Sequence, residues 1–197
     1  MGPALLRYCE VMGIRCRSRA FTLIEAMIVV AIVGVLALLA VAGYRRWVHT
    51  AYVNEAQDMV ANIRTAEESF RAENGGYLSV SNGIGPGSDY PAATPGKFKT
   101  EWGGPCGVCS GTATWLALNV RPSGPVYFGY SLQANTTPAQ APAFAAITAN
   151  GQALNVNAMT PPWYLVEADG DIDGNGIFTK VYGMSATNRI YIDNEGE

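Results

Sequence analysis

Histidine is nearly absent from this 197-residue chain, and its scarcity limits the chemistry that the chain can perform. The single histidine, His49, lies just after a long apolar run, so the C-terminal part offers no general base for a Ser-His-Asp triad. No glycine-rich phosphate loop follows a predicted strand and opens a helix. We therefore expect a protein without enzymatic activity.

Charged residues are also sparse, at 15% of the chain, and they are unevenly distributed. Residues 1–20 contain four arginines and one glutamate, a net charge of +3, so the rest of the chain carries −6. No cluster of lysine or arginine follows Arg45 and Arg46, which leaves no electrostatic footprint for nucleic acid. No nucleic-acid partner is therefore evident from the sequence.

What the sequence does contain is a long apolar run at 21–44, in which Thr22 and Glu25 are the only clearly polar side chains. As a helix this run would rise about 36 Å, enough to cross a hydrocarbon core of about 30 Å. The basic residues before the run outnumber the Arg45–Arg46 pair after it, which favours a cytoplasmic N-terminus. The C-terminal part would then lie outside the cytoplasm, where disulfides persist.

Two ordinary interpretations of this run leave something unexplained. A secretory signal peptide has a short apolar stretch followed by a small residue at the cleavage site, whereas here Ala20 precedes a longer run. A simple membrane anchor fits the length. However, a carboxylate such as Glu25 within a spanning helix costs about 2.5–3.5 kcal/mol, less when it lies near the interface. An incidental carboxylate near the membrane surface is the plainest alternative.

Residues 19–34, RAFTLIEAMIVVAIVG, resemble the N-terminal signature of type IV pilins and pseudopilins. The resemblance implies that a prepilin peptidase cuts between Ala20 and Phe21 and N-methylates Phe21. It also implies that Glu25 pairs with the terminal amine of Phe21 in a neighbouring subunit when the apolar helices bundle into a filament. A paired buried charge of this kind would mainly fix the register of assembly.

The sequence departs from the family pattern at two places. The family usually has glycine before the cut, where this chain has Ala20. Related pilins often have a proline within the apolar segment that kinks the helix, whereas this run contains Gly34 and Gly43 but no proline. The missing proline slightly favours a minor pilin or pseudopilin over a main filament subunit.

An amphipathic pattern continues the helix beyond the apolar run. Apolar residues recur at steps of three or four and share one face: Val48, Tyr52, Ala56, Met59, Ile63, Ala66 and Phe70. The opposite face is polar: Glu55, Asp58, Arg64, Glu68 and Arg71. Asn74-Gly75-Gly76 can end the helix, because glycine readily takes the left-handed conformation of a C-cap. The pattern therefore predicts one helix over residues 21–73.

The remaining residues predict a head built on an antiparallel sheet. Residues 77–99 and 133–143 have the composition of loops. Short segments of strand-like pattern predict strands at 112–120, 126–132, 144–148, 163–168, 177–182 and 189–192. Such a sheet can bury one face against the amphipathic helix, so we expect an α+β fold. Its parts are a leader (1–20), an apolar core helix (21–44), an amphipathic half-helix (45–73) and the head (74–197).

Cys106 and Cys109 form a C-x-x-C within a Gly/Pro-rich stretch. We predict that they form a disulfide that tightens a surface turn outside the cytoplasm. A redox centre would need the cysteines between a strand and a helix in a βαβ unit, and zinc would need two further ligands. Those two sites and a pair of free thiols are the alternatives.

A second motif, EADGDIDGNG, places Asp169, Asp171 and Asp173 at alternate positions and Gly174 next. This resembles the first half of a calcium loop, although Lys180 stands where the loop would have its last glutamate. A turn between two strands is the alternative, because aspartate and glycine also suit a hairpin. We therefore keep Ca²⁺ as a possible cofactor and require none.

Together these features predict a type IV pilin-like structural subunit. Its expected partners are other pilin subunits, the prepilin peptidase and the inner membrane. The chain would lie in the inner membrane before assembly, with the head outside the cytoplasm, and at the cell surface within a pilus afterwards. A pseudopilin of a type II secretion system and a membrane-anchored binding module are the alternatives.

Overall fold

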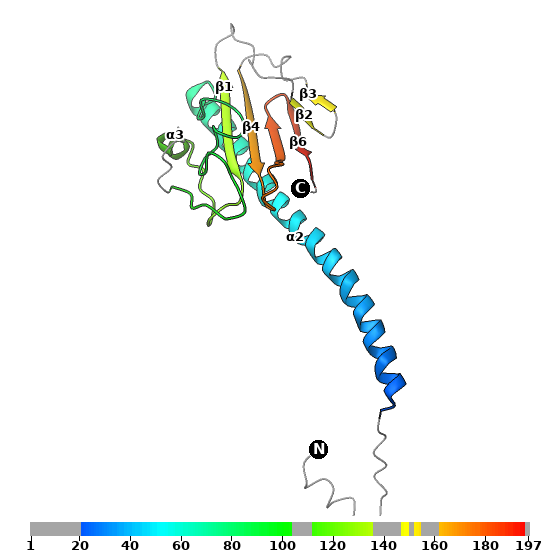
Figure 1. Cartoon of the computed structure of the whole chain (residues 1–197). Coiled ribbons are helices and arrows are strands. Elements are labelled where there is room, and N and C mark those ends of the chain that lie inside the picture. The colour runs from blue at the N-terminus through cyan, green and yellow to red at the C-terminus, as the bar shows by residue number, and fades with distance from the viewer. Residues whose placement is uncertain (1–20, 104–111, 136–146, 150–151, 155–161, 196–197) are drawn as a thin grey trace, which may run out of the picture. The chain divides into compact units, whose positions relative to one another are not determined.

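A computed structural model describes residues 21–103, 112–135, 147–149, 152–154 and 162–195 (Figure 1). The chain divides into two compact units that meet between Tyr44 and Arg45. One helix, α2 (Leu23–Asn74, 52 residues), contributes to both units. It begins two residues later and ends one residue later than the sequence predicts, so the predicted long helix is confirmed.

In the first unit, α2 is an apolar helix with its side chains exposed. Its N-terminus is capped by Thr22, whose Oγ1 accepts a hydrogen bond from the backbone N–H of Glu25 at 3.3 Å. No residue in its most apolar stretch is buried. Among the described residues, α2 is the one helix long and apolar enough to cross a membrane.

In the second unit, α2 buries one face in the main core. Of the predicted stripe, Ala56, Met59 and Ile63 are buried, whereas the other members are only half-buried. The buried face also includes Val53, Val60 and Glu67, so it is centred slightly away from the predicted stripe. The helix ends as predicted: Gly75 has a φ of 80°, and its N–H donates to the carbonyl of Arg71 at 2.8 Å.

The sheet that faces this helix has four antiparallel strands in the order β1-β4-β5-β6 (Figure 1). The strands are β1 (Gly129–Asn135), β4 (Trp163–Gly170), β5 (Thr179–Met184) and β6 (Thr187–Asp193). One face packs in the same core as the helix and includes Tyr130, Leu132, Tyr164, Val166 and Val181. The α+β fold with a helix on an antiparallel sheet is therefore confirmed.

The other face of the sheet carries a smaller core and a group of charged side chains. Its apolar part consists of Ala149, Leu154, Trp163, Leu165, Tyr182 and Met184. Two of these come from a short ribbon of β2 (Ile147–Ala149) and β3 (Gln152–Leu154), which pair antiparallel. The charged side chains on this second face include Glu167, Asp169 and Lys180.

The prediction of a strand at 112–120 is wrong, because this segment begins with a short helix, α3 (Thr112–Ala117). The backbone N–H of Leu118 donates to the carbonyl of Thr114, and Asn119 ends the turn with a φ of 55°. Burial of Trp115 explains why this segment is a helix and not a strand, because the side chain is 1% exposed and stacks on Tyr90. Alternation in the sequence therefore misled the prediction, since the apolar side chains of this segment serve a single helical turn.

The other strands were predicted in place but with shifted bounds. Residues 163–168 and 189–192 lie within β4 and β6, whereas β1 and β5 are displaced toward the C-terminus by two or three residues. Residues 133–135, predicted as loop, extend β1. Part of the segment predicted at 144–148 is β2, and its first three residues lie outside the described residues. Strand β3 was not predicted.

Candidate functional site

The residues of the predicted processing and assembly site lie at the start of α2. Phe21 is 76% exposed and directly precedes the capping residue Thr22. Glu25 lies in the first helical turn, where a negative charge interacts favourably with the helix dipole. Ala20, on the other side of the predicted cut, lies outside the described residues.

The surface that follows this start is apolar all round the helix. Its large exposed side chains are Phe21, Leu23, Ile24, Met27, Ile28, Val29, Val30, Ile32, Val33, Val35, Leu36, Leu38, Leu39, Val41 and Tyr44. A helix that is hydrophobic on every side is normally buried in a membrane or in a protein core. The first unit contains no described element that covers these side chains, so they are available to a bilayer or to other chains.

Three polar residues of α2 connect its second half to the head. Arg64 donates to the carbonyl of Thr187 at 3.0 Å and to that of Asn188 at 3.2 Å. Glu55 accepts the backbone N–H of Tyr127 at 3.1 Å. The sequence placed Glu55 and Arg64 on a polar outer face, but their side chains reach around the helix to the head.

The third of these residues, Glu67, is fully buried. One of its carboxylate oxygens accepts the backbone N–H of Leu78 at 3.0 Å, and its other oxygen has no described hydrogen-bond donor. Burial raises the pKa of Glu67 to about 7, partly offset by that hydrogen bond. Sequence reasoning missed this residue, because a glutamate within an amphipathic helix normally faces solvent.

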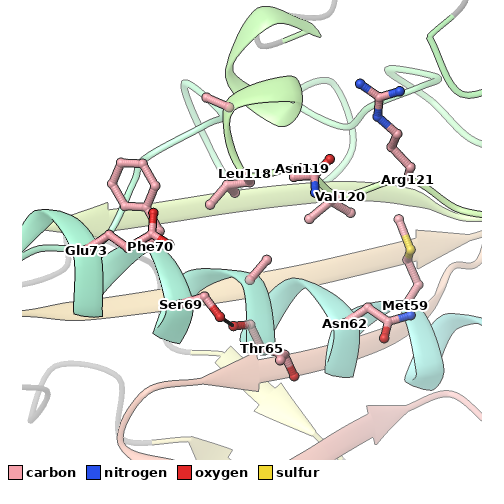
Figure 2. Close-up of a pocket in the computed structure, with 12 residues that line it drawn as sticks. Met59, Asn62, Thr65, Ser69, Phe70, Glu73, Leu118, Asn119, Val120 and Arg121 are labelled. Atoms are coloured by element: carbon pink, nitrogen blue, oxygen red, sulfur yellow. Dashed lines mark hydrogen bonds between the residues drawn. The ribbon is translucent and has the colours of Figure 1, made fainter.

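A groove runs between α2 and the segment after α3 (Figure 2). Its apolar lining includes Phe70 from the helix and Leu118 and Val120 from the opposite side. Among the described residues, Glu73 and Arg121 are the charged ones that line it. No group of three described His, Cys, Asp or Glu side chains that could hold a metal ion lines it.

The aspartate motif forms the turn between β4 and β5, which we call the aspartate turn (residues 171–178). Asp171 accepts the backbone N–H groups of Gly174 (2.8 Å), Asn175 (3.0 Å) and Gly176 (3.1 Å). Asp173 accepts from Asn175 at 3.1 Å. These bonds are the local contacts expected of a turn built from aspartate and glycine.

Asp169 lies apart from this turn, at the end of β4, where it is fully buried. It pairs with Lys180 across the β4–β5 ladder, with 3.1 Å between Oδ1 and Nζ. Within the described residues, no group of three His, Cys, Asp or Glu side chains could hold a metal ion. The calcium hypothesis stays a prediction.

The predicted disulfide between Cys106 and Cys109 cannot be placed, because both cysteines lie outside the described residues. The Gly/Pro-rich stretch around them begins after Gly103, whose backbone N–H donates to the hydroxyl of Tyr90 at 2.7 Å. The disulfide stays a prediction from the sequence.

The fold and the start of α2 define a class of protein: a long helix, apolar and then amphipathic, that carries an antiparallel sheet on its second half. Comparison with known families identifies the N-terminal segment that includes the beginning of α2. Residues 15–41 match the family described as the prokaryotic N-terminal methylation motif. This match includes Ala20, Phe21 and Glu25, and it confirms the resemblance that residues 19–34 carry.

The chain is similar to type IV major pilin and fimbrial proteins from several organisms. The chain is 41% identical over 69 residues to the type IV major pilin protein PilA of Myxococcus xanthus, covering 35% of this chain and 31% of PilA. It is 34% identical over 104 residues to the type IV major pilin protein PilE1 of Neisseria gonorrhoeae, covering 53% of this chain and 61% of PilE1. No solved structure matches.

A third relative is the type IV major fimbrial protein FimA of Dichelobacter nodosus, 41% identical over 52 residues, which are 26% of this chain and 33% of FimA. The chain thus spans between about a third and three-fifths of the length of these relatives. The resemblance to type IV pilins is confirmed.

Proposed function

We propose that this chain is a structural subunit of a type IV pilus, held in the inner membrane before assembly and bundled by its apolar helix afterwards. The observation that carries the proposal is the exposed apolar surface of α2 up to Tyr44, with Glu25 as its only carboxylate. A bilayer and a bundle of identical helices are two environments that can cover such a surface on every side.

The same proposal explains the basic leader, residues 1–20. The arginines before Phe21 would keep the N-terminus in the cytoplasm, where a prepilin peptidase can reach the bond between Ala20 and Phe21. Cleavage there would leave Phe21 at the new terminus and Glu25 as the fifth residue. The helix begins at Leu23, so the new amine would lie within one turn of the carboxylate of its own chain.

Assembly would bring Glu25 near the amine of Phe21 in a neighbouring subunit. An unpaired carboxylate within an apolar bundle is costly, while a carboxylate paired with an amine is much less so. The pair would therefore penalise every register except the one in which the two charges meet. In this proposal apolar contacts drive bundling, and Glu25 selects its register.

The first experiment identifies the mature N-terminus by mass spectrometry of the purified protein. We expect a chain that starts with N-methylated Phe21. A functional protein that retains residues 1–20 would refute processing and with it the proposed function.

The second experiment compares Glu25→Ala with Asp58→Ala. Asp58 is an exposed acidic residue on the second half of the same helix and serves as the matched control. We expect Glu25→Ala to insert into the membrane at least as well as wild type but to be lost from sheared filaments. Asp58→Ala should enter filaments normally. Normal incorporation of Glu25→Ala would refute the register role.

The same fractions separate the alternatives. Recovery of the chain in sheared surface filaments supports a pilus subunit. A chain that is processed but stays with the cell envelope and is required for protein secretion would instead be a pseudopilin. An unprocessed chain that stays in the membrane would be an anchored binding module.

A further inference from the structure

The second face of the sheet holds a buried group of charges that the proposed function does not use. Asp89, Glu167 and Asp169 are 0%, 3% and 0% exposed. Glu167 and Asp169 lie on β4, Lys180 lies on the neighbouring β5, and Asp89 comes from the loop before β1. We call these four residues the carboxylate cluster.

The cluster contains three carboxyl groups and only one ammonium group. The Nζ atom of Lys180 lies 2.7 Å from Oε1 of Glu167 and 3.1 Å from Oδ1 of Asp169. Neither oxygen of Asp89 has a hydrogen bond of ordinary geometry from a described residue, and the neighbouring hydroxyl of Ser131 offsets only part of the effect of burial. If all four groups were ionised, the cluster would carry a buried net charge of −2, which is strongly unfavourable.

Asp89 is held in this position by the backbone around it. The N–H and carbonyl groups of Tyr90 pair with those of Tyr130 at 3.0 and 2.8 Å, so the loop runs along the edge of β1. A Cβ atom at Gly129 would lie only 2.6 Å from that of Asp89, so this β1 position has no room for a side chain. Asp89 therefore packs tightly against β1 while this segment stays on the sheet.

The segment that carries Asp89 is attached to the same face at a second point. The backbone N–H of Gly85 donates to Oγ of Ser131 at 3.1 Å, and a Cβ at Gly85 would lie 3.7 Å from Oε1 of Glu167. Residues 80–92 thus cover Glu167 as well as Asp89. Water can reach the carboxylates from this side only when the segment lifts.

We propose that the carboxylate cluster is a proton-operated latch, which holds residues 80–92 on the sheet while Asp89 and Asp169 keep protons and lets the segment open in alkaline solution. Protonated carboxyl groups can donate hydrogen bonds to their neighbours, which removes both the excess charge and the lack of donors. The proposal concerns the head alone and does not depend on filament assembly.

The ionisation of the cluster agrees with this geometry. Burial and the charge of Glu167 raise the pKa of Asp89 to about 7 and that of Asp169 to about 9. For Lys180, burial lowers the pKa, but the carboxylates of Asp169 and Glu167 outweigh it and the net shift is upward. While the aspartates hold protons, the ammonium of Lys180 still has the carboxylate of Glu167 as its partner, at 2.7 Å.

The other polar groups that face the cluster are few. Ser131 faces Asp89 from β1, and the hydroxyl of Tyr182 faces Glu167 from β5. Asp193 on β6 acts on Tyr182, whose pKa is raised by burial and then by Glu167, Asp169 and Asp193. Tyr182 therefore stays neutral throughout the range in which the aspartates titrate.

The direction of the pH effect follows from these shifts. An exposed aspartate titrates near pH 4, whereas Asp169 in the closed head keeps its proton up to about pH 9. Between about pH 7 and 9, opening releases this proton, so the opening equilibrium should increase about tenfold per pH unit. Below about pH 7, Asp89 adds to the same slope.

The test is hydrogen–deuterium exchange of residues 80–92 in the full chain in detergent micelles, with rates corrected for the intrinsic pH dependence of exchange. In wild type we expect the opening equilibrium to increase about a hundredfold from pH 7 to pH 9. Asp169→Asn should remove most of this increase, because asparagine has no proton to lose. Asp58→Asn, on the exposed face of α2, should leave it unchanged.

Two results would overturn the latch. The first is a wild-type segment whose corrected opening equilibrium does not change between pH 7 and 9, and this measurement needs no variant. The second is an Asp169→Asn chain with the wild-type slope. Should Asp169→Asn fail to fold, Asp89→Asn serves instead, and it should flatten the slope between about pH 5 and 7.

Discussion

The close contact between α2 and β5 at Gly183 yields a demanding test of the head. A Cβ atom at Gly183 would lie 2.7 Å from Cγ1 of Val60 and 2.8 Å from Cδ of Arg64, both on α2. Val60 is fully buried, in a close-packed interior where a side chain turns only at a cost. Arg64 could move, but it would then lose its hydrogen bonds to the carbonyls of Thr187 and Asn188.

The expected cost of Gly183→Ala follows from these two contacts. Overpacking a well-packed core costs about 1–3 kcal/mol, and each hydrogen bond of Arg64 that is lost costs about 0.5–1.5 kcal/mol. We therefore expect the free energy of unfolding to decrease by about 2–4 kcal/mol. For a unit of this size, the Tm should decrease by roughly 5–15 °C.

The assay is thermal unfolding of the full chain in detergent micelles, followed by near-ultraviolet circular dichroism, which reports the packing of buried aromatic residues such as Trp115. The matched control is Gly124→Ala, at an exposed position where an added Cβ meets no atom within 4 Å. The Tm of this control should stay within about 1 °C of wild type. If Gly183→Ala melts with its control, the helix does not pack on the sheet as closely as described.

Three further predictions concern other parts of the head. Wild type should lose stability as the pH rises from about 4.5 through 7, because buried Glu67 must then give up its proton. Glu67→Gln should remove this loss, so the variant should be roughly 1–3 kcal/mol more stable than wild type at pH 8, as measured by Tm at pH 4.5 and pH 8. Asp171→Ala should cost about 1–2 kcal/mol by removing the acceptor of three backbone N–H groups. Millimolar calcium tests the metal prediction: a saturable rise in the wild-type Tm would show a metal site, and an unchanged Tm would count against one. A mature chain with a disulfide between Cys106 and Cys109 should take up thiol label only after reduction, and labelling without reductant would contradict the pairing.

The long helix could be predicted because two strong local signals define it. Its apolar run leaves no alternative to a helix in a membrane or bundle, and Gly75 supplies the left-handed residue that its end requires. The buried face was only partly predictable. Val53 and Val60 lie beside the predicted stripe, and the head, rather than the periodicity of the helix, decides how far that stripe extends.

The head was harder to predict, because its decisive contacts connect residues far apart in the sequence. The short helix α3 is held by Trp115, which packs with Tyr90 and Trp102 from another segment, so the local alternation carried no information about it. Asp89 lies in a Gly/Pro/Ser-rich loop whose path no periodicity describes. Its burial depends on pairing with β1 along the backbone, which side-chain patterns do not report.

Lys180 shows how one residue can give a misleading signal in the sequence and a clear one in the structure. Counted along the chain, it stands where a calcium loop would end in glutamate, and it therefore weakened the calcium hypothesis. In the fold, Asp169 and Lys180 are direct partners across the β4–β5 ladder, so the first and last positions of the supposed loop face each other, with 3.1 Å between Oδ1 and Nζ. The ammonium thus supplies, from within the chain, the positive charge that calcium would bring to Asp169. It supplies one charge where three carboxylates meet, and protons are the simplest source of the remainder. The pH sensitivity of the cluster therefore comes from its excess of buried carboxylates over the single ammonium of Lys180.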